Sequence, residues 1–354
     1  MPGDGHDGQK SPYAIALPQG GREPNAASFF APRPLDEGGP AWGWGTRSRC
    51  PREKRPMIRD GVRPATPADI DPVCRLLHDK MSRRLAPARW RRLMTYGWLE
   101  KKPDLGRVAV AEGRVVGFVG MVHADRDVAG RRERVVNICA WYLNKDHRGR
   151  GLGAELMRQA TEDEAMSYTI LTSSSRTLGL LDRIGYRVLD HDRRLWSPRG
   201  SPQGPAAAGG GTGTPLEITR HPARILSRAG ELERRLLRDH ADLPITPVLI
   251  ADGKESCLAV FSVKKKGEAV TYFDALHIAN PPFFAARAQA IADSLLPQNG
   301  KAVLAADTRL LGAHGAGGTV ERLPVARYYK SARLKPGDID NMYSEVQLLD
   351  LKLD

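Results

Sequence analysis

The sequence predicts a mixed α/β (α+β) fold in which a mostly antiparallel sheet is flanked by helices, present in two tandem copies. Three observations lead to this prediction. Apolar positions between residues 57 and 197 favour the order helix, helix, three strands, helix, strand, helix, strand. Residues 198–215 then form a stretch rich in Gly and Ala that shows neither the helical nor the strand spacing of apolar residues. Beyond it, residues 216–354 repeat the order in a degenerate form.

Length and composition divide the chain into four parts. At 354 residues it exceeds one typical domain of about 100 to 200 residues, so we expect two folded units. Residues 1–56 are rich in Gly, Pro and Ser without a sustained apolar period, which predicts a disordered extension, and Met57 is a candidate alternative start. The expected folded units are residues 57–197 and 216–354, joined by a flexible linker at 198–215.

The first unit shows its elements in regular order. Residues 67–78 and a stretch up to residue 100 have helical spacing, and residues 108–111 and 115–122 flank a short turn typical of a hairpin. A buried strand is expected at 135–143. The remaining elements are a helix at about 152–166, a strand at 168–173, a short helix that ends at Gly185 and a closing strand at 186–196.

The second unit repeats this pattern but lacks one feature. Residues 248–254 followed by 257–263 mirror the hairpin of the first unit, and residues 269–278, 282–296 and 302–307 match its later strand, helix and strand. Pro281 and Pro282 stand where the first unit has a glycine-rich turn. Because proline has no backbone N–H, we expect this half not to hold a pyrophosphate.

The glycine-rich turn lies between residues 143 and 154 of the first unit. Gly149, Gly151 and Gly153 permit a tight turn and close approach of a ligand, and Arg148 and Arg150 add positive charge. A helix follows directly, and the N–H groups at its start attract phosphate. A dinucleotide-binding turn would follow the first strand of a βαβ unit, whereas this turn follows the fourth strand.

At Arg148, Gly151 and Gly153 the sequence resembles the GNAT acyltransferase superfamily, whose motif lies between the fourth strand and the third helix. The resemblance covers residues 61–197 and implies a GNAT-like fold with acetyl-CoA as co-substrate. It implies that the backbone of the fourth strand pairs with the pantetheine arm, and that Ser174 stands where the family often has a cofactor-contacting Asn. The expected cofactor-binding residues are Trp141, Tyr142, Leu143, Arg148, Gly149, Arg150, Gly151, Leu152, Gly153 and Ser174.

Acyl transfer to an amine needs a base for the ammonium and an acid for the thiolate. Glu133, His123 and Asp125 are the candidate bases, because they lie near the ends of the third and fourth expected strands. Many family members carry a Tyr four residues before the glycine that ends the fourth helix, but this position is Leu181 here. Tyr142 or a water is the remaining candidate acid.

The expected function is therefore transfer of an acyl group from acetyl-CoA to an amine acceptor, either a small molecule, an amino sugar or a protein amine. Two alternatives stay open: an acyl-CoA-binding module without catalysis, and a nucleic-acid-binding protein that uses the net charge of +13. The second is disfavoured because the arginines are scattered along the chain. The tandem units are expected to act as a pseudo-dimer.

Composition also bears on metals and on the compartment. The four cysteines are widely spaced and form no CxxC pattern, so we expect neither a metal site nor a disulfide framework. No apolar run approaches the roughly 18 residues of a membrane span, and the N-terminus lacks the apolar core of a signal peptide. These features favour a cytoplasmic protein.

Overall fold

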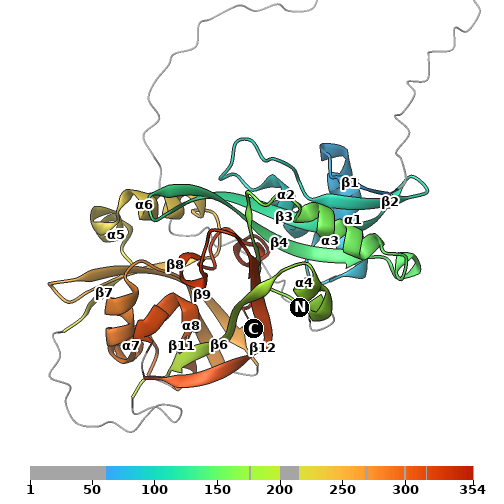
Figure 1. Cartoon of the computed structure of the whole chain (residues 1–354). Helices are drawn as coiled ribbons and strands as arrows, with labels where there is room; N and C mark the ends of the chain where they lie inside the picture. The colour runs from blue at the N-terminus through green and yellow to red at the C-terminus, as the bar shows by residue number, and fades with distance from the viewer. Residues whose placement is uncertain are drawn as a thin grey trace, which may run out of the picture.

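The computed structural model describes residues 61–174, 177–199, 215–267, 270–298, 300–315 and 317–353. The expectations for residues 1–56 and for most of the linker lie outside these ranges. The described residues form two halves that share one 12-stranded sheet (Figure 1). Helices flank this mixed, mostly antiparallel sheet, so the predicted fold class is confirmed.

The first half contains the elements expected from residues 61–197, with some shorter than the apolar pattern indicated. Its helix α3 ends at Ala160, where Thr161 turns its hydroxyl back to the carbonyl of Met157 at 3.0 Å. The elements are β1 (Gly61–Pro64), η1 (Pro67–Asp69), α1 (Ile70–Lys80), α2 (Pro87–Thr95), β2 (Arg107–Ala111), β3 (Arg114–Val128), β4 (Arg131–Leu143), η2 (Lys145–His147), α3 (Leu152–Ala160), β5 (Ser167–Ile170), α4 (Leu178–Arg183) and β6 (Arg187–Trp196).

The second half repeats this order, with a long helix, α7, in the place of α3. Its elements are β7 (Glu217–Thr219), α5 (Pro222–Arg228), α6 (Glu231–Asp239), β8 (Thr246–Ala251), β9 (Ser256–Lys266), β10 (Val270–Ile278), α7 (Pro281–Leu295), β11 (Ala302–Asp307), α8 (Thr308–Leu311), η4 (Gly312–His314), β12 (Thr319–Lys330), η5 (Pro336–Asp338) and α9 (Glu345–Leu348).

The two halves exchange their last long strands. The strand order is β1-β2-β3-β4-β5-β12-β6-β11-β10-β9-β8-β7, so β12 pairs with β5 of the first half and β6 pairs with β11 of the second. In Figure 1, β6 accordingly lies beside β11 and β12. Residues 186–196 were expected to close the sheet of the first unit. Instead, within the described ranges, β6 pairs with β11 and β12, both contributed by the second half.

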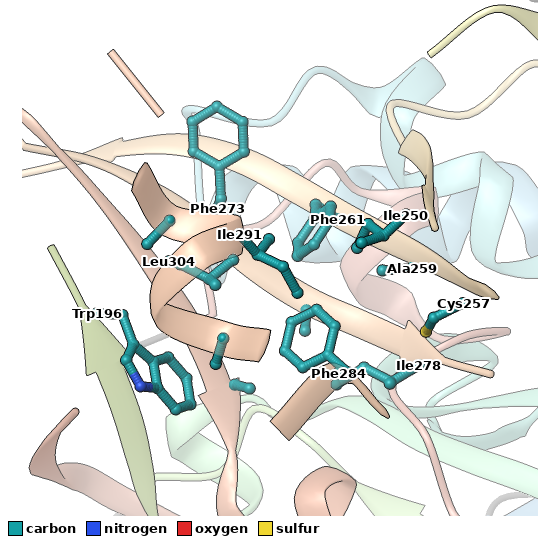
Figure 2. Packing of buried hydrophobic residues seen from close by; sticks show 14 of the residues in the cluster. Trp196, Ile250, Cys257, Ala259, Phe261, Phe273, Ile278, Phe284, Ile291 and Leu304 are labelled. Atoms are coloured by element: carbon teal, nitrogen blue, oxygen red, sulfur yellow. The ribbon is translucent and has the colours of Figure 1, made fainter. Parts of the chain in front are cut away.

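The core of the second half shows what fixes this exchange. Trp196, at the end of β6, is 2% exposed and belongs to the apolar cluster formed by β8 to β11 and α7. Figure 2 shows its indole beside this cluster, which includes Phe284 and Leu304. Burying a side chain of this size contributes roughly 2 to 3 kcal/mol, so β6 is anchored by its far end in the other half.

A buried ionic cluster holds the exchanged strands to the rest of the sheet. Asp307 accepts from Arg309 Nη1 at 2.8 Å and from Arg327 Nη2 at 3.0 Å, and Arg309 Nη1 also donates to Asp190 at 2.8 Å. Burial alone would raise the pKa of Asp307, but the positive charges of Arg327 and Arg309 outweigh it and lower the pKa. The cluster therefore links β6, β11 and β12.

The C-terminal segment, residues 331–353, crosses from the second half to the first. Leu348 and Leu349 pack into the apolar cluster under α1 and α2, while Met342, Tyr343 and Val346 belong to a cluster that draws on both halves. The segment is thus buried between the halves. It brings polar side chains of the second half close to β4 and β5.

Candidate functional site

Strands β4 and β5 separate soon after they begin to pair. Their parallel register covers Val135 with Ser167, Val136 with Tyr168 and Asn137 with Thr169, whereas β4 continues to Leu143 beside β3 alone. We call the point of separation, at Asn137 and Thr169, the fork. Alternate residues of β4 direct their backbone groups away from β3, so the strand beyond the fork offers an edge to an extended ligand.

A β-bulge changes the direction of β4 within this free edge. The register with β3 shifts between Gly120, opposite Cys139, and Phe118, opposite Tyr142, and Ala140 takes a φ of 48° at the extra residue. A bulge bends its strand and strengthens the local twist. The end of β4 therefore turns away from β5 and leads into the glycine-rich turn.

The turn after β4 has the backbone conformation that glycine allows. Gly149 and Gly151 have φ of 78° and 80°, which a residue with a Cβ adopts only with strain. In the described part of the chain, no atom lies within 4 Å of the position that a Cβ would take at either glycine. The space in front of both residues is open for a ligand.

The start of α3 faces that open space. Gly151 is the N-cap, and among the residues that the structure describes no side chain caps the helix. The backbone N–H groups of Leu152, Gly153 and Ala154 precede the first residue that donates within the helix, Glu155, whose N–H donates to the Gly151 carbonyl at 2.9 Å. Free N–H groups and the positive end of the helix dipole together favour an anion such as phosphate.

Arg148 stabilises the turn rather than projecting freely. Its Nε donates to the carbonyl of Leu143 at 2.9 Å, and its guanidinium lies 5.6 Å from the centre of the Tyr142 ring. Lys145 and Arg150 are exposed on the same turn. The turn thus carries one cation that is held by a hydrogen bond and two that are exposed.

The other residues expected to bind the cofactor surround this turn, with one exception. Leu143 and Trp141 pack under α3: a Cβ at Gly153 would lie 3.7 Å from Leu143 Cδ2 and 4.0 Å from Trp141 Cζ2. Leu152 is partly buried against the apolar cluster that contains Leu143. Ser174 lies apart, exposed after β5, where its carbonyl accepts from Thr177 N at 2.9 Å.

The corresponding place in the second half is occupied by the chain itself. Pairing of β10 with β11 ends at Asp274, and beyond it the backbone N–H of Asn341 donates to the carbonyl of Leu276 at 2.8 Å. Helix α7 begins with Pro281 and Pro282, and the side chain of Asn280 accepts from Phe283 N at 3.2 Å. The strand edge and the helix start that are open in the first half are therefore filled in the second.

Comparison with known proteins identifies the first half. Residues 71–175 match the model of the acetyltransferase (GNAT) family. The chain carries a GNAT domain. The match begins within α1 and ends after β5, and so includes the fork and the turn. No curated protein matches this chain.

Solved structures with a similar arrangement of chain are distant in sequence. A GCN5-related N-acetyltransferase from Anabaena variabilis is 14% identical, covers 77% of this chain and 72% of its own, and has a TM-score of 0.48. A GCN5-related N-acetyltransferase from Kribbella flavida is 16% identical, with coverage of 76% and 70% and a TM-score of 0.47. The GNAT-family protein YhbS from Escherichia coli, solved in complex with CoA, is 21% identical over 38% of this chain and 72% of its own, with a TM-score of 0.28.

The residues expected to catalyse the reaction do not converge in the GNAT domain. Glu133 lies four residues before Asn137, about 14 Å along β4, and its Oε2 accepts from Arg333 Nε at 2.8 Å. Tyr142 lies five residues after Asn137, about 17 Å along the strand in the other direction. Asp125 accepts from Arg132 at 2.6 Å and also bonds Arg134.

His123 lies on the opposite face of the sheet from Asn137. It pairs with Val136, which packs under α3, and its Nε2 lies 3.4 Å from Asp104 Oδ1. Leu181, in the position where the resemblance would place a Tyr, is 1% exposed in that same apolar cluster. Neither side chain therefore lies on the face of the sheet where the C-terminal segment meets the fork.

The structure instead brings a carboxylate that the sequence did not single out to the fork. The backbone N–H of Glu345, in α9, donates to Asn137 Oδ1 at 3.0 Å, and the Glu345 Oε1 accepts from Thr172 Oγ1 at 2.7 Å. Glu345 is 1% exposed, and its Oε2 has no hydrogen-bond partner in the described residues. Burial raises the pKa of Glu345 to about 7, although the bond from Thr172 lowers it.

One small cavity borders the fork, and two larger clefts are lined by other residues. A small one of about 10 Å³, room for about one water, is bordered by Asn137 and Thr169 together with Arg126 and Tyr343. A larger cleft of about 100 Å³ shares Arg126 and Tyr343 with it and is lined by Asp125, Asp127 and Glu233. A third cleft, of about 370 Å³, lies between α2 and the end of α6 and is lined by Trp98, Asp239 and Leu348 among others.

In the residues that the structure describes, no group of three or more His, Cys, Asp or Glu side chains is placed to hold a metal ion. Over the same residues, none of the helices has the length and apolar character needed to cross a bilayer.

Proposed function

We propose that this protein transfers an acyl group, from acetyl-CoA in the first instance, to an amine acceptor, with one acyl-CoA site per chain. The observation that carries the proposal is the combination in one place of a strand that loses its neighbour and an uncapped helix behind a glycine turn. A strand edge suits the amides of the pantetheine arm, and the helix start suits its pyrophosphate. The match of residues 71–175 to the GNAT family supports this assignment.

Within this proposal the expected cofactor residues divide into three roles. Gly149, Gly151, Leu152 and Gly153 supply backbone N–H groups and access, and Arg150 supplies exposed charge. The β4 residues Trp141, Tyr142 and Leu143 supply the strand edge. Arg148 stabilises the turn by its hydrogen bond to the carbonyl of Leu143. Ser174 lies on the opposite branch of the fork, after β5.

We also propose that residues 57–197 and 216–354 act together rather than as separate units. The exchange of β6 and β12 makes each half depend on a strand of the other. The second half would then serve as the pseudo-dimer partner that completes the site of the GNAT domain.

Turnover with a panel of amines tests the function. The full chain would be incubated with acetyl-CoA and a polyamine, an amino sugar, an amino acid amide or a short peptide, with release of the CoA thiol followed in time and the products examined by mass spectrometry. We expect thiol release that depends on at least one amine and yields its acetylated form.

Two other outcomes would favour the alternatives. Tight acetyl-CoA binding without amine-dependent release would favour a binding module, to which the buried Leu181 lends some support because it cannot protonate a thiolate. Affinity for duplex DNA that falls steeply with salt, together with no effect of acetyl-CoA on thermal unfolding, would favour a nucleic-acid-binding protein.

A further inference from the structure

We infer that Glu345, carried by the C-terminal segment of the second half, is the general base of the reaction in the first half, with Thr172 as its positioning residue. The inference rests on the proposed acyltransferase function and adds the catalytic group that this function lacks. Glu345 lies far from the fork in sequence, 173 residues after Thr172 and 208 after Asn137. Only the crossing of the C-terminal segment brings it there.

The position of Glu345 suits a base for an amine at the fork. An acyl group carried along the free edge of β4 ends where β4 and β5 meet, since pairing stops at Asn137 and Thr169. Asn137 binds the backbone of Glu345 and Thr172 binds one carboxylate oxygen. The second oxygen, Oε2, has no partner in the described residues and is free to accept a proton.

The surroundings of the carboxylate bring the pKa of Glu345 close to neutral pH. Burial disfavours the charged form and raises the pKa of Glu345 to about 7, while Thr172 and the charge of Arg327 oppose that rise. A base is most effective when its pKa lies near the working pH. Glu133, by comparison, is held in an ion pair with Arg333 and lies about 14 Å away along β4.

The step balances as follows. Glu345 Oε2 removes one proton from the substrate ammonium, and the nitrogen lone pair then forms the C–N bond to the thioester carbonyl carbon. The C–S bond breaks, and the CoA sulfur leaves with its electron pair and takes up the second proton from the nitrogen. Glu345 finally releases its proton to solvent, so the amide, CoA thiol and one proton are the products.

The central test compares Glu345→Gln with the wild type. Glutamine keeps the shape and the Thr172 bond but cannot accept the proton, so we expect kcat to fall about 100-fold or more while the Kd for acetyl-CoA changes less than twofold. The wild-type rate should fall as the pH drops through about 7. The rate of the variant should instead keep rising with pH as the amine loses its proton unaided.

Three variants provide controls. Glu255→Gln changes an exposed glutamate in the β8–β9 turn and should leave kcat and its pH profile unchanged. Glu133→Gln tests the competing base and should retain the acid limb near pH 7. Thr172→Val removes a bond that lowers the pKa of Glu345, so the acid limb should move to higher pH, which a merely structural role would not produce.

The outcomes separate the two proposals. A Glu345→Gln enzyme with kcat within threefold of the wild type, or a Thr172→Val enzyme with an unmoved acid limb, would overturn the role of Glu345 and leave the acyltransferase intact. A wild type that binds acetyl-CoA but acylates no amine would overturn the proposed function, and the role of Glu345 with it.

Discussion

At the scale of single residues, the burial of Glu345 has a cost in stability that the proposed role as a base would explain. A carboxylate that is 1% exposed and has one unpartnered oxygen is costly to keep charged, since an apolar environment favours the protonated form. A structural carboxylate would be expected to have a cation bonded to it. Glu345 has a hydroxyl, from Thr172, and no salt bridge within the described residues.

This cost predicts a pH-dependent difference in stability between Glu345→Gln and the wild type. The folded pKa of about 7 lies above the ordinary value of 4.5, so the folded state holds the extra proton between these values. The contribution of Glu345 to stability is therefore complete below pH 4.5 and is lost as the pH rises through 7. The loss amounts to about 3 kcal/mol.

Urea unfolding at pH 5 and pH 8 measures this effect. The free energy of unfolding of Glu345→Gln, taken relative to the wild type at the same pH, should be higher at pH 8 than at pH 5. The increase should be of the order of that loss. Glu255→Gln, which changes an exposed side chain, should show the same small difference at both pH values. An equal offset for Glu345→Gln at pH 5 and pH 8 would mean that its carboxyl titrates normally in the folded protein.

At the scale of elements, the exchange of β6 and β12 determines which parts of the chain can fold. Strand β12 lies between β5 and β6, and Trp196 at the end of β6 is buried in the second half. A fragment ending at residue 197 would leave one edge of β5 open, where β12 belongs, would leave both edges of β6 unpaired, and would expose that indole. Unpaired strand edges of this kind promote aggregation.

We therefore expect the fragment 57–197 to lack a cooperative unfolding transition, although it contains every residue matched by the family. The fragment 57–354, which keeps all exchanged strands, should unfold cooperatively like the full chain. Circular dichroism during urea unfolding of both fragments, at equal concentration, decides the question. A sigmoidal transition and acetyl-CoA binding by fragment 57–197 would show that β12 is dispensable.

The elements that the sequence predicted well are those with local causes. The hairpin β2–β3 was foreseen because two apolar runs flank a short turn, which is one residue shorter in the structure than expected since Ala111 pairs with Arg114, and β8–β9 because it repeats that pattern. The turn at Gly149 and Gly151 was foreseen because glycine spacing before a helix has a direct backbone meaning. Neither depends on a distant part of the chain.

What could not be predicted depends on contacts across the chain. Alternation indicates that β6 is a strand but does not say whether its neighbour is β5, β11 or β12, since all three offer apolar faces. Glu345 stood in a mixed polar and apolar stretch after the last strand, with no motif that marked it as a catalytic residue. Its partners, Asn137 and Thr172, are far away in sequence and meet it only because the C-terminal segment crosses between the halves.

At the scale of the whole molecule, the two halves repeat one order of elements but differ at the place where a ligand could bind. The first half leaves the β4 edge beyond the fork and the start of α3 open, whereas the second half fills the corresponding places, with Asn341 at Leu276 and with Asn280 at the start of α7. We propose that the first half alone holds the donor site and that the C-terminal segment of the second half contributes Glu345 to it. This division is the central claim of the account.

Calorimetric titration of the full chain with acetyl-CoA tests this claim most directly. We expect one site per chain, lost in Gly151→Asp, where a carboxylate would face the pyrophosphate, and kept in Gly130→Asp. Gly130 is a matched control because its φ of 75° is close to the 80° of Gly151, it too has open space, and it lies at the far end of β4. Two sites per chain, or undiminished binding by Gly151→Asp, would contradict the account.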